Sequence, residues 1–151
     1  MENKALLPKW FREFPGVEWI VISGQKLPVL DDKYRVTLDV KGKRLTGSAP
    51  ELAAYELLSA VPGTLSFNHA AELFQGLVNL NPRKVEYLLS VSQSVQTKRL
   101  YLFFASFYEH GWLRRIDSQK IDLGAGKRQI VVNGKFNAQY QITVPERFQK
   151  E

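Results

Sequence analysis

The segment that follows Ser94 and ends at Gly111 places the strongest constraint on the fold of this 151-residue chain. Ser94 is a favourable residue at the start of a helix and Gly111 at its end, so the segment predicts one helix that runs to His110. The centre of this helix, Leu100–Ala105, is apolar on all sides. Because such a helix has to be buried, we expect the rest of the chain to pack around it.

Three further helices are expected before it. The first runs from Ser48 to about Ala60, with Ser48 and Glu51 in the spacing of a capping box and Pro50 in the first turn. The second follows Ser66 and carries apolar residues as far as Leu77. The third begins at Asn81-Pro82, where the asparagine can cap the first turn.

Short extended segments precede the helices. Residues 17–22 form an apolar, β-branched run, and residues 34–40 alternate with the period of a strand that has one buried face. A turn over residues 41–44 is followed by a third extended segment at Leu45-Thr46, so a meander of three short strands is expected. Before it, the spacing of Leu6, Trp10, Phe11 and Phe14 predicts an amphipathic helix that ends at Pro15-Gly16.

The last third of the chain returns to strands. Residues 128–132 and 140–144 alternate, and Asn133-Gly134 between them indicates a turn, which together predict a β-hairpin. The fold class expected is therefore α+β, with about four central helices packed on short antiparallel strands. We expect one domain over 1–151: an N-terminal helix and meander in 1–47, a helical core in 48–111, and a basic loop with the hairpin in 112–151.

Composition excludes several classes of function. The chain has no cysteine and two histidines, which excludes a disulfide scaffold, a thiolate metal site and a histidine-rich metal centre. It has no apolar run long enough to span a membrane and no secretory signal, so a cytoplasmic protein is expected. The net charge is +6, and residues 111–151 hold eight Lys and Arg against four Asp and Glu. A basic surface of this kind attracts nucleic acid, although a solvated basic face explains the composition as well.

Residues 124–128, Gly-Ala-Gly-Lys-Arg, form the most conspicuous local motif. A glycine loop followed by cations can hold a phosphate through its backbone N–H groups. It is not a P-loop, because Ile121 stands where that motif has its first glycine and no Ser or Thr follows Lys127. The alternative is a tight turn, shaped by Gly124 and Gly126, with its cations in solvent.

A binding face is expected where the long helix and the hairpin pack side by side. The candidate nucleic-acid or partner contacts are Lys98, Arg99, Arg114, Arg115, Lys120, Lys127 and Arg128. The order of helices followed by a hairpin is also that of a winged helix, in which one helix reads the major groove. Against this, the last helix before the hairpin is the most apolar one in the chain.

No constellation of residues predicts catalysis. No pair of carboxylates has a spacing that requires acid–base chemistry, and no nucleophile-elbow pattern occurs. We therefore expect no enzyme activity, no catalytic residue, no cofactor, no metal and no small-molecule substrate.

The C-terminal half carries a series of motifs in a fixed order: Lys98-Arg-Leu-Tyr-Leu-Phe-Phe-Ala105, Trp112, Ile121-Asp-Leu-Gly-Ala-Gly-Lys-Arg128, Gly134 and Tyr140-Gln-Ile-Thr-Val-Pro145. In these motifs the chain resembles the AbiEi family of antitoxins and transcriptional regulators from type IV toxin–antitoxin and abortive-infection systems, which act in phage defence. Leu7-Pro-Lys-Trp10, Ser48-Ala-Pro-Glu51 and Leu77-Val-Asn-Leu-Asn-Pro82 extend the resemblance over nearly the whole chain.

The resemblance implies two activities: transcriptional regulation through an N-terminal DNA-binding winged helix-turn-helix, and antagonism of a nucleotidyltransferase toxin by the domain that follows. No helix-turn-helix pattern precedes Leu7, so the expectation is that this sequence corresponds to the second domain. The partners expected are a nucleotidyltransferase toxin and nucleic acid, with no membrane. A nucleic-acid-binding module that uses the basic C-terminal face is the alternative function.

Overall fold

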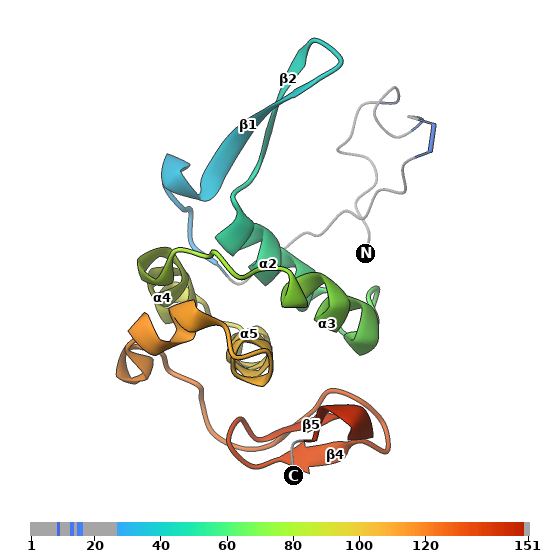
Figure 1. The fold of residues 1–151 in the computed structure, drawn as a ribbon, viewed down its shortest axis with the longest axis vertical. Helices are drawn as coiled ribbons and strands as arrows, with labels where there is room; N and C mark the ends of the chain where they lie inside the picture. Colours follow the sequence, from blue (N-terminus) through green and yellow to red (C-terminus); the bar gives the residue numbers. More distant parts are fainter. Residues whose placement is uncertain (1–8, 10–12, 14, 17–26, 150–151) are drawn as a thin grey trace.

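The computed structural model describes residues 9, 13, 15–16 and 27–149 of the chain. Apart from isolated positions, the helix predicted before Pro15 and the strand predicted over 17–22 fall outside the described residues. In the part that is described, four helices lie between two small β-sheets (Figure 1). The predicted α+β class is confirmed.

The four helices occur where the sequence predicts them, except that the last one ends at Phe107 and not at the predicted His110, because the chain turns at Glu109, whose φ is 55°. They are α2 (Pro50–Ser59), α3 (Phe67–Gln75), α4 (Pro82–Val91) and α5 (Val95–Phe107). Three begin at the predicted caps, because the side chains of Ser66, Asn81 and Ser94 each accept a hydrogen bond from a backbone N–H in the first turn. Helix α5 is buried from Thr97 to Ala105, and both α2 and α3 contact it.

The predicted capping box of the first helix is wrong. The residue at the cap is Ala49, which makes no side-chain capping bond. The Ser48 hydroxyl instead donates to the Glu56 carboxylate at 2.9 Å, and the Glu51 carboxylate accepts from the Asn81 N–H at 2.9 Å. Ser48 is unable to cap the helix because it is the last residue of a strand and pairs with Arg35.

Strands β1 (Arg35–Val40) and β2 (Lys43–Ser48) pair antiparallel across a two-residue turn. Lys41 and Gly42 at this turn have φ values of 51° and 77°, as a hairpin of this length requires. The prediction that residues 34–40 bury one face is wrong, because all six residues of β1 are exposed. The physical reason is visible in Figure 1: the ribbon projects from the helices, so only its base, at Tyr34, is buried.

The C-terminal strands form a three-stranded sheet in the order β3 (Arg128–Gln129), β5 (Ile142–Val144), β4 (Lys135–Asn137). The predicted hairpin between 128–132 and 140–144 is wrong in its direction, because β3 pairs with β5 in parallel. The antiparallel partner of β5 is β4, which follows the predicted turn at Asn133-Gly134. The chain leaves the β3 ladder at Ile130, whose N–H donates to the Thr143 hydroxyl at 2.8 Å.

Short 3-10 helices complete the described fold: η2 (Asp32–Tyr34), η3 (Gly111–Arg115), η4 (Ser118–Lys120) and η5 (Glu146–Phe148). The core between them is rich in aromatic rings, among which Phe74 packs edge-on against Tyr101 with ring centroids 5.3 Å apart. The Trp112 indole N–H donates to the Leu77 carbonyl at 2.9 Å. Over the described residues, every buried side-chain nitrogen and oxygen has a hydrogen-bond partner. None of the helices in this part of the chain is long and apolar enough to cross a membrane.

Candidate functional site

The start of α5 and the glycine loop are held together by Arg99. Its guanidinium donates from Nε to the Leu123 carbonyl at 2.9 Å and from one terminal nitrogen to the Gly126 carbonyl at 2.6 Å. The same nitrogen lies 3.4 Å from the Gln141 carbonyl, beside the first residue of β5. Arg99 is 2 % exposed, and burial followed by the charge of Arg128 lowers its pKa. The arginine therefore clamps the loop and the sheet onto α5.

The loop itself has the shape of a tight turn. Gly124 and Gly126 have φ values of 64° and 82°, in the region that favours glycine. A Cβ on Gly124 would lie 2.8 Å from a methyl group of Val95. The Gly124 N–H donates to the Asp122 carboxylate at 2.8 Å, and the Leu123 and Gly126 carbonyls face Arg99. Of the two interpretations of this motif, the geometry matches the turn.

Lys98 is 4 % exposed on the same turn of α5. Burial lowers the pKa of its ammonium group, while the Asp122 carboxylate acts in the opposite direction. Together, Lys98 and Arg99 lie inside the fold rather than on the face where the sequence predicts them to act. Whether binding depends on them stays a prediction.

The other five predicted cations, of which Arg128 is half-buried and four are exposed, divide into two groups. Lys127 and Arg128 follow the glycine loop: the Lys127 ammonium lies 4.9 Å from the centre of the Phe136 ring, and Arg128 donates to the Ala125 and Lys127 carbonyls at 3.3 Å. The second group comprises Arg114, Arg115 and Lys120, in η3 and η4, which pack against α4. With the buried Lys98 and Arg99, four of the seven predicted residues thus lie beside the glycine loop. The other three lie beside α4.

Within the second group, Lys120 forms an ion pair with Glu86 at 3.2 Å. The Asp117 N–H, and then Lys120, hold the pKa of the Glu86 carboxyl below its usual value. Arg114 and Arg115 are exposed and make no ion pair within the described part of the chain. They are therefore, like the exposed Lys127, accessible to an anionic partner.

Helix α5 has no exposed polar face that could enter a DNA groove. Its residues from Thr97 to Ala105 are all buried. A recognition helix has to present side chains to the base edges, which α5 does not do over this range. If the chain binds nucleic acid, the contacts come from the exposed cations instead.

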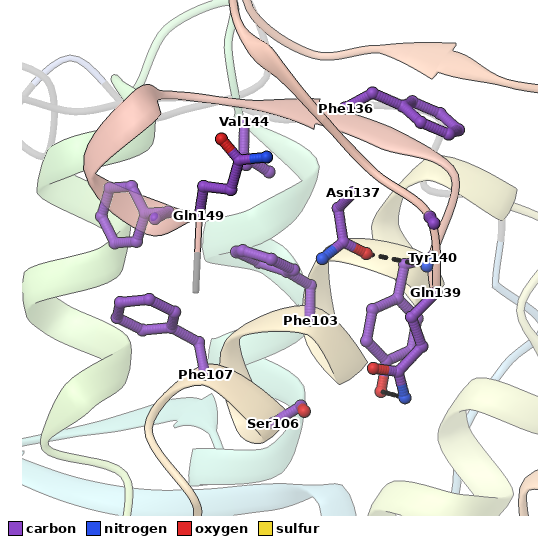
Figure 2. A pocket seen from close by; sticks show the side chains of 11 residues that line it. Phe103, Ser106, Phe107, Phe136, Asn137, Gln139, Tyr140, Val144 and Gln149 are labelled. Carbon is purple, nitrogen blue, oxygen red and sulfur yellow. Dashed lines mark hydrogen bonds between the residues drawn. The ribbon is translucent and has the colours of Figure 1, made fainter. Parts of the chain in front are cut away.

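Sequence reasoning missed a pocket of about 310 Å³ between α5 and the C-terminal strands. Phe103 and Phe107 from α5, with Phe148 from η5, form its apolar side. The amide side chains of Asn137, Gln139 and Gln149 lie around it (Figure 2). The sequence offered one signal for this pocket, an isolated phenylalanine at 136 in a polar stretch. In the structure this residue lines the pocket and is 41 % exposed.

The described residues contain no group of three His, Asp or Glu side chains that could hold a metal ion. His110 is buried, and its Nε2 lies 3.0 Å from the Phe74 carbonyl, which accounts for it structurally. His69 is exposed beside Glu72 at 4.0 Å.

Comparison with protein families gives one match over almost the whole chain. The family model described as "Transcriptional regulator, AbiEi antitoxin, Type IV TA system" matches residues 1–145. No curated protein and no solved structure gives a significant match.

Proposed function

Because the chain belongs to the AbiEi family of type IV antitoxins and transcriptional regulators, we propose that it neutralises a nucleotidyltransferase toxin. The observation that carries the proposal is the family match over residues 1–145. The AbiEi family is regulatory, which supports a role through binding rather than catalysis. We also propose that residues 1–151 act as one unit, since Arg99 joins the helical core to the C-terminal sheet.

The test is co-expression in a bacterial host with a nucleotidyltransferase toxin of a type IV system. We expect the chain to restore colony formation that the toxin alone abolishes. A chain that is folded and expressed but leaves growth arrested would contradict the proposal. Leu100→Pro serves as the unfolded control, because it breaks the buried central helix.

The exposed cations are proposed as the contact surface. Arg114→Ala with Arg115→Ala tests the group beside α4, and Lys127→Ala tests the group beside the glycine loop. Arg83→Ala, an exposed cation at the start of α4, is the matched control for charge. We propose a positioning role for Arg99, which holds the loop that carries Lys127 and Arg128.

A second candidate function is nucleic-acid binding through the same cations, favoured by the exposure of Arg114 and Arg115. The affinity of such binding falls steeply as the salt concentration rises. On duplex DNA, each phosphate contact contributes about −0.9 to the slope of log K against log salt concentration. We expect Arg114→Ala with Arg115→Ala to reduce that slope by roughly two, since each phosphate-contacting cation contributes about one. A slope equal to that of the Arg83→Ala control would assign the contacts to other residues.

A further inference from the structure

We propose that the two-stranded ribbon of β1 and β2, residues 35–48, binds duplex DNA with its polar face in the major groove. This inference goes beyond neutralisation of a toxin and does not depend on it. It also assigns contacts to an element that lies outside the seven cations predicted from the sequence.

The ribbon has the shape that entry into a groove requires. Its two six-residue strands project from the helices, and every residue of β1 is exposed (Figure 1). A strand of six residues spans about 20 Å. The major groove of B-DNA is about 12 Å wide and admits a two-stranded β-ribbon. Helix α5 lacks this access, because it is buried from Thr97 to Ala105.

The register of the two strands gives the ribbon one polar face. Thr37 pairs with Thr46 and Asp39 pairs with Arg44, so these four side chains lie on the same face. Arg35 shares this face, because successive odd-numbered residues of β1 point to the same side. All five residues are exposed. The face therefore offers hydroxyl groups at its centre and a guanidinium on each strand.

The opposite face is apolar and packs upon itself. It carries Val36, Leu38 and Val40, with Leu45 paired to Leu38. A Cβ on Gly47 would lie 3.1 Å from a methyl group of Leu38, so the Leu38 side chain lies over the neighbouring strand. Contacts of this kind across the strands stabilise the ribbon itself. The polar face is the one suited to a hydrated, charged partner.

The ribbon is strongly basic. Residues 35–48 contain four Lys and Arg against one acidic residue. Arg35 and Arg44 are exposed, and neither guanidinium makes an ion pair or a side-chain hydrogen bond within the described part of the chain. Both guanidinium groups are therefore available to phosphate oxygens, which arginine binds well.

The carboxylates near the ribbon lie at its turn and at its base. Asp39 accepts a hydrogen bond from the backbone N–H of the turn glycine at 3.1 Å. At the base, the Glu56 carboxylate accepts from the Ser48 hydroxyl at 2.9 Å, and Asp31 forms an ion pair with Lys33 at 3.5 Å. The strands and their turn therefore keep an excess of positive charge.

A DNA duplex matches this ribbon better than an acidic protein surface or an RNA duplex does. The duplex carries one negative charge per about 1.7 Å of its axis, which suits cations spread over both strands and the turn. Arginines can contact the phosphates while Thr37 and Thr46 face the base edges, a division of roles common in DNA recognition. An RNA duplex has a deep, narrow major groove that side chains do not enter.

The test measures binding to the 151-residue chain by fluorescence anisotropy over a series of salt concentrations. The probes are a labelled DNA duplex and an RNA duplex of the same sequence and length. The ribbon variant is Arg35→Gln with Arg44→Gln. The matched control is Lys135→Gln with Arg147→Gln, two exposed cations of the C-terminal part, at the other end of the molecule (Figure 1).

We expect the ribbon variant to weaken DNA binding by roughly tenfold or more at low salt. The slope of log K against log salt concentration should fall in magnitude by roughly two, since each phosphate-contacting cation contributes about one. The control should change both quantities far less. Val36→Thr with Leu38→Thr and Val40→Thr, on the apolar face, should leave the affinity for DNA unchanged. The parent chain should bind the DNA duplex more tightly than the RNA duplex.

Several outcomes would overturn the proposal. They are equal losses in the ribbon variant and its control, equal affinity for the two duplexes, and no binding of the DNA duplex. A salt slope that falls only in Arg114→Ala with Arg115→Ala would place the DNA on η3 instead. Loss of toxin neutralisation in the ribbon variant, without DNA binding by the parent chain, would assign the ribbon to an acidic protein surface. Urea midpoints equal to that of the parent chain show that the variants are folded.

Discussion

At the scale of single residues, Arg99 ties three carbonyl groups of the C-terminal third to α5. Its side chain reaches carbonyl groups that lie 24, 27 and 42 residues further along the chain. Hydrogen bonds from a charged donor are each worth about 1.5–3 kcal/mol, and a buried carbonyl left without a partner is costly. An arginine is suited to this position because its planar fork serves several acceptors at once.

Replacing Arg99 by Met should therefore lower the free energy of unfolding by about 2–4 kcal/mol, because the Leu123 and Gly126 carbonyls lose their charged donor, although the Gln141 carbonyl keeps the Arg128 N–H. Arg99→Lys should recover only part of this loss, since one ammonium group cannot reach the same set of acceptors. Urea unfolding followed by circular dichroism measures both. Arg83→Met, at an exposed position, is the control and should change stability by less than about 0.5 kcal/mol. Equal effects at the two positions would contradict the clamp.

The glycine loop gives a second residue-scale prediction. Gly124→Ala introduces both an unfavourable positive φ and a contact of 2.8 Å with Val95. Gly42→Ala has a positive φ of 77° but meets nothing within 4 Å, so it isolates the backbone cost of about 1–2 kcal/mol. We expect Gly124→Ala to be the more destabilising of the two, and Val95→Ala added to it to relieve the steric part. A thermal unfolding series in which Gly42→Ala is the worse variant would refute this account.

At the scale of elements, the helices could be predicted from sequence and the sheets only in part. Ser66, Asn81 and Ser94 cap helices through bonds to residues two or three positions away, so the signal is local. The direction of β3 depends on how the chain travels from Gln129 to Ile142, which no local pattern encodes. The alternation in β1 correctly predicted a strand, but burial of one face requires a neighbour across it, and the ribbon has none among the described residues. The partners of Arg99 and the amide-lined pocket were beyond prediction for the same reason.

The exposed ribbon makes an element-scale prediction. Val36, Leu38 and Val40 lie on one face of β1 and are each more than one-third exposed. Changing all three to Thr should alter the free energy of unfolding by less than about 1 kcal/mol in total, because threonine keeps strand propensity and little area is buried. The contrast is Val85→Thr in the core, which buries a hydroxyl and should cost about 1–3 kcal/mol. Chemical denaturation measures the free energy of unfolding of both variants. A loss of stability in the ribbon variant as large as that in Val85→Thr would show that the ribbon face is covered.

At the scale of the whole molecule, buried phenols make stability depend on alkaline pH. Burial is the first cause that raises the pKa of Tyr34, to about 12, and it also raises that of Tyr55, Tyr101, Tyr108 and Tyr140. A raised pKa means that the folded state favours the neutral phenol. The stability this provides is complete below about pH 10, where unfolded tyrosine begins to ionise, and is lost as pH rises further.

We therefore expect the free energy of unfolding to fall steadily above about pH 10. Lys98 and Arg99 act in the opposite direction, because their lowered pKa values favour the uncharged forms as pH rises, but they are two groups against five. Urea unfolding at increasing pH measures the loss, and phenolate absorbance should titrate later in the folded chain than in denaturant. A stability that is constant through this range would contradict the burial of these rings.

The projecting β1–β2 ribbon has a consequence for motion. Among the described residues, its strands bond to each other and its main contacts with the rest are to η2 and α2, while α5 is buried from Thr97 to Ala105 (Figure 1). Opening the ribbon therefore exposes little apolar surface, whereas opening α5 requires the core to come apart. Amide hydrogens of the ribbon should exchange with deuterated solvent through local fluctuations, and those of α5 through global unfolding alone. We therefore expect the centre of the molecule to stay folded when the ribbon opens.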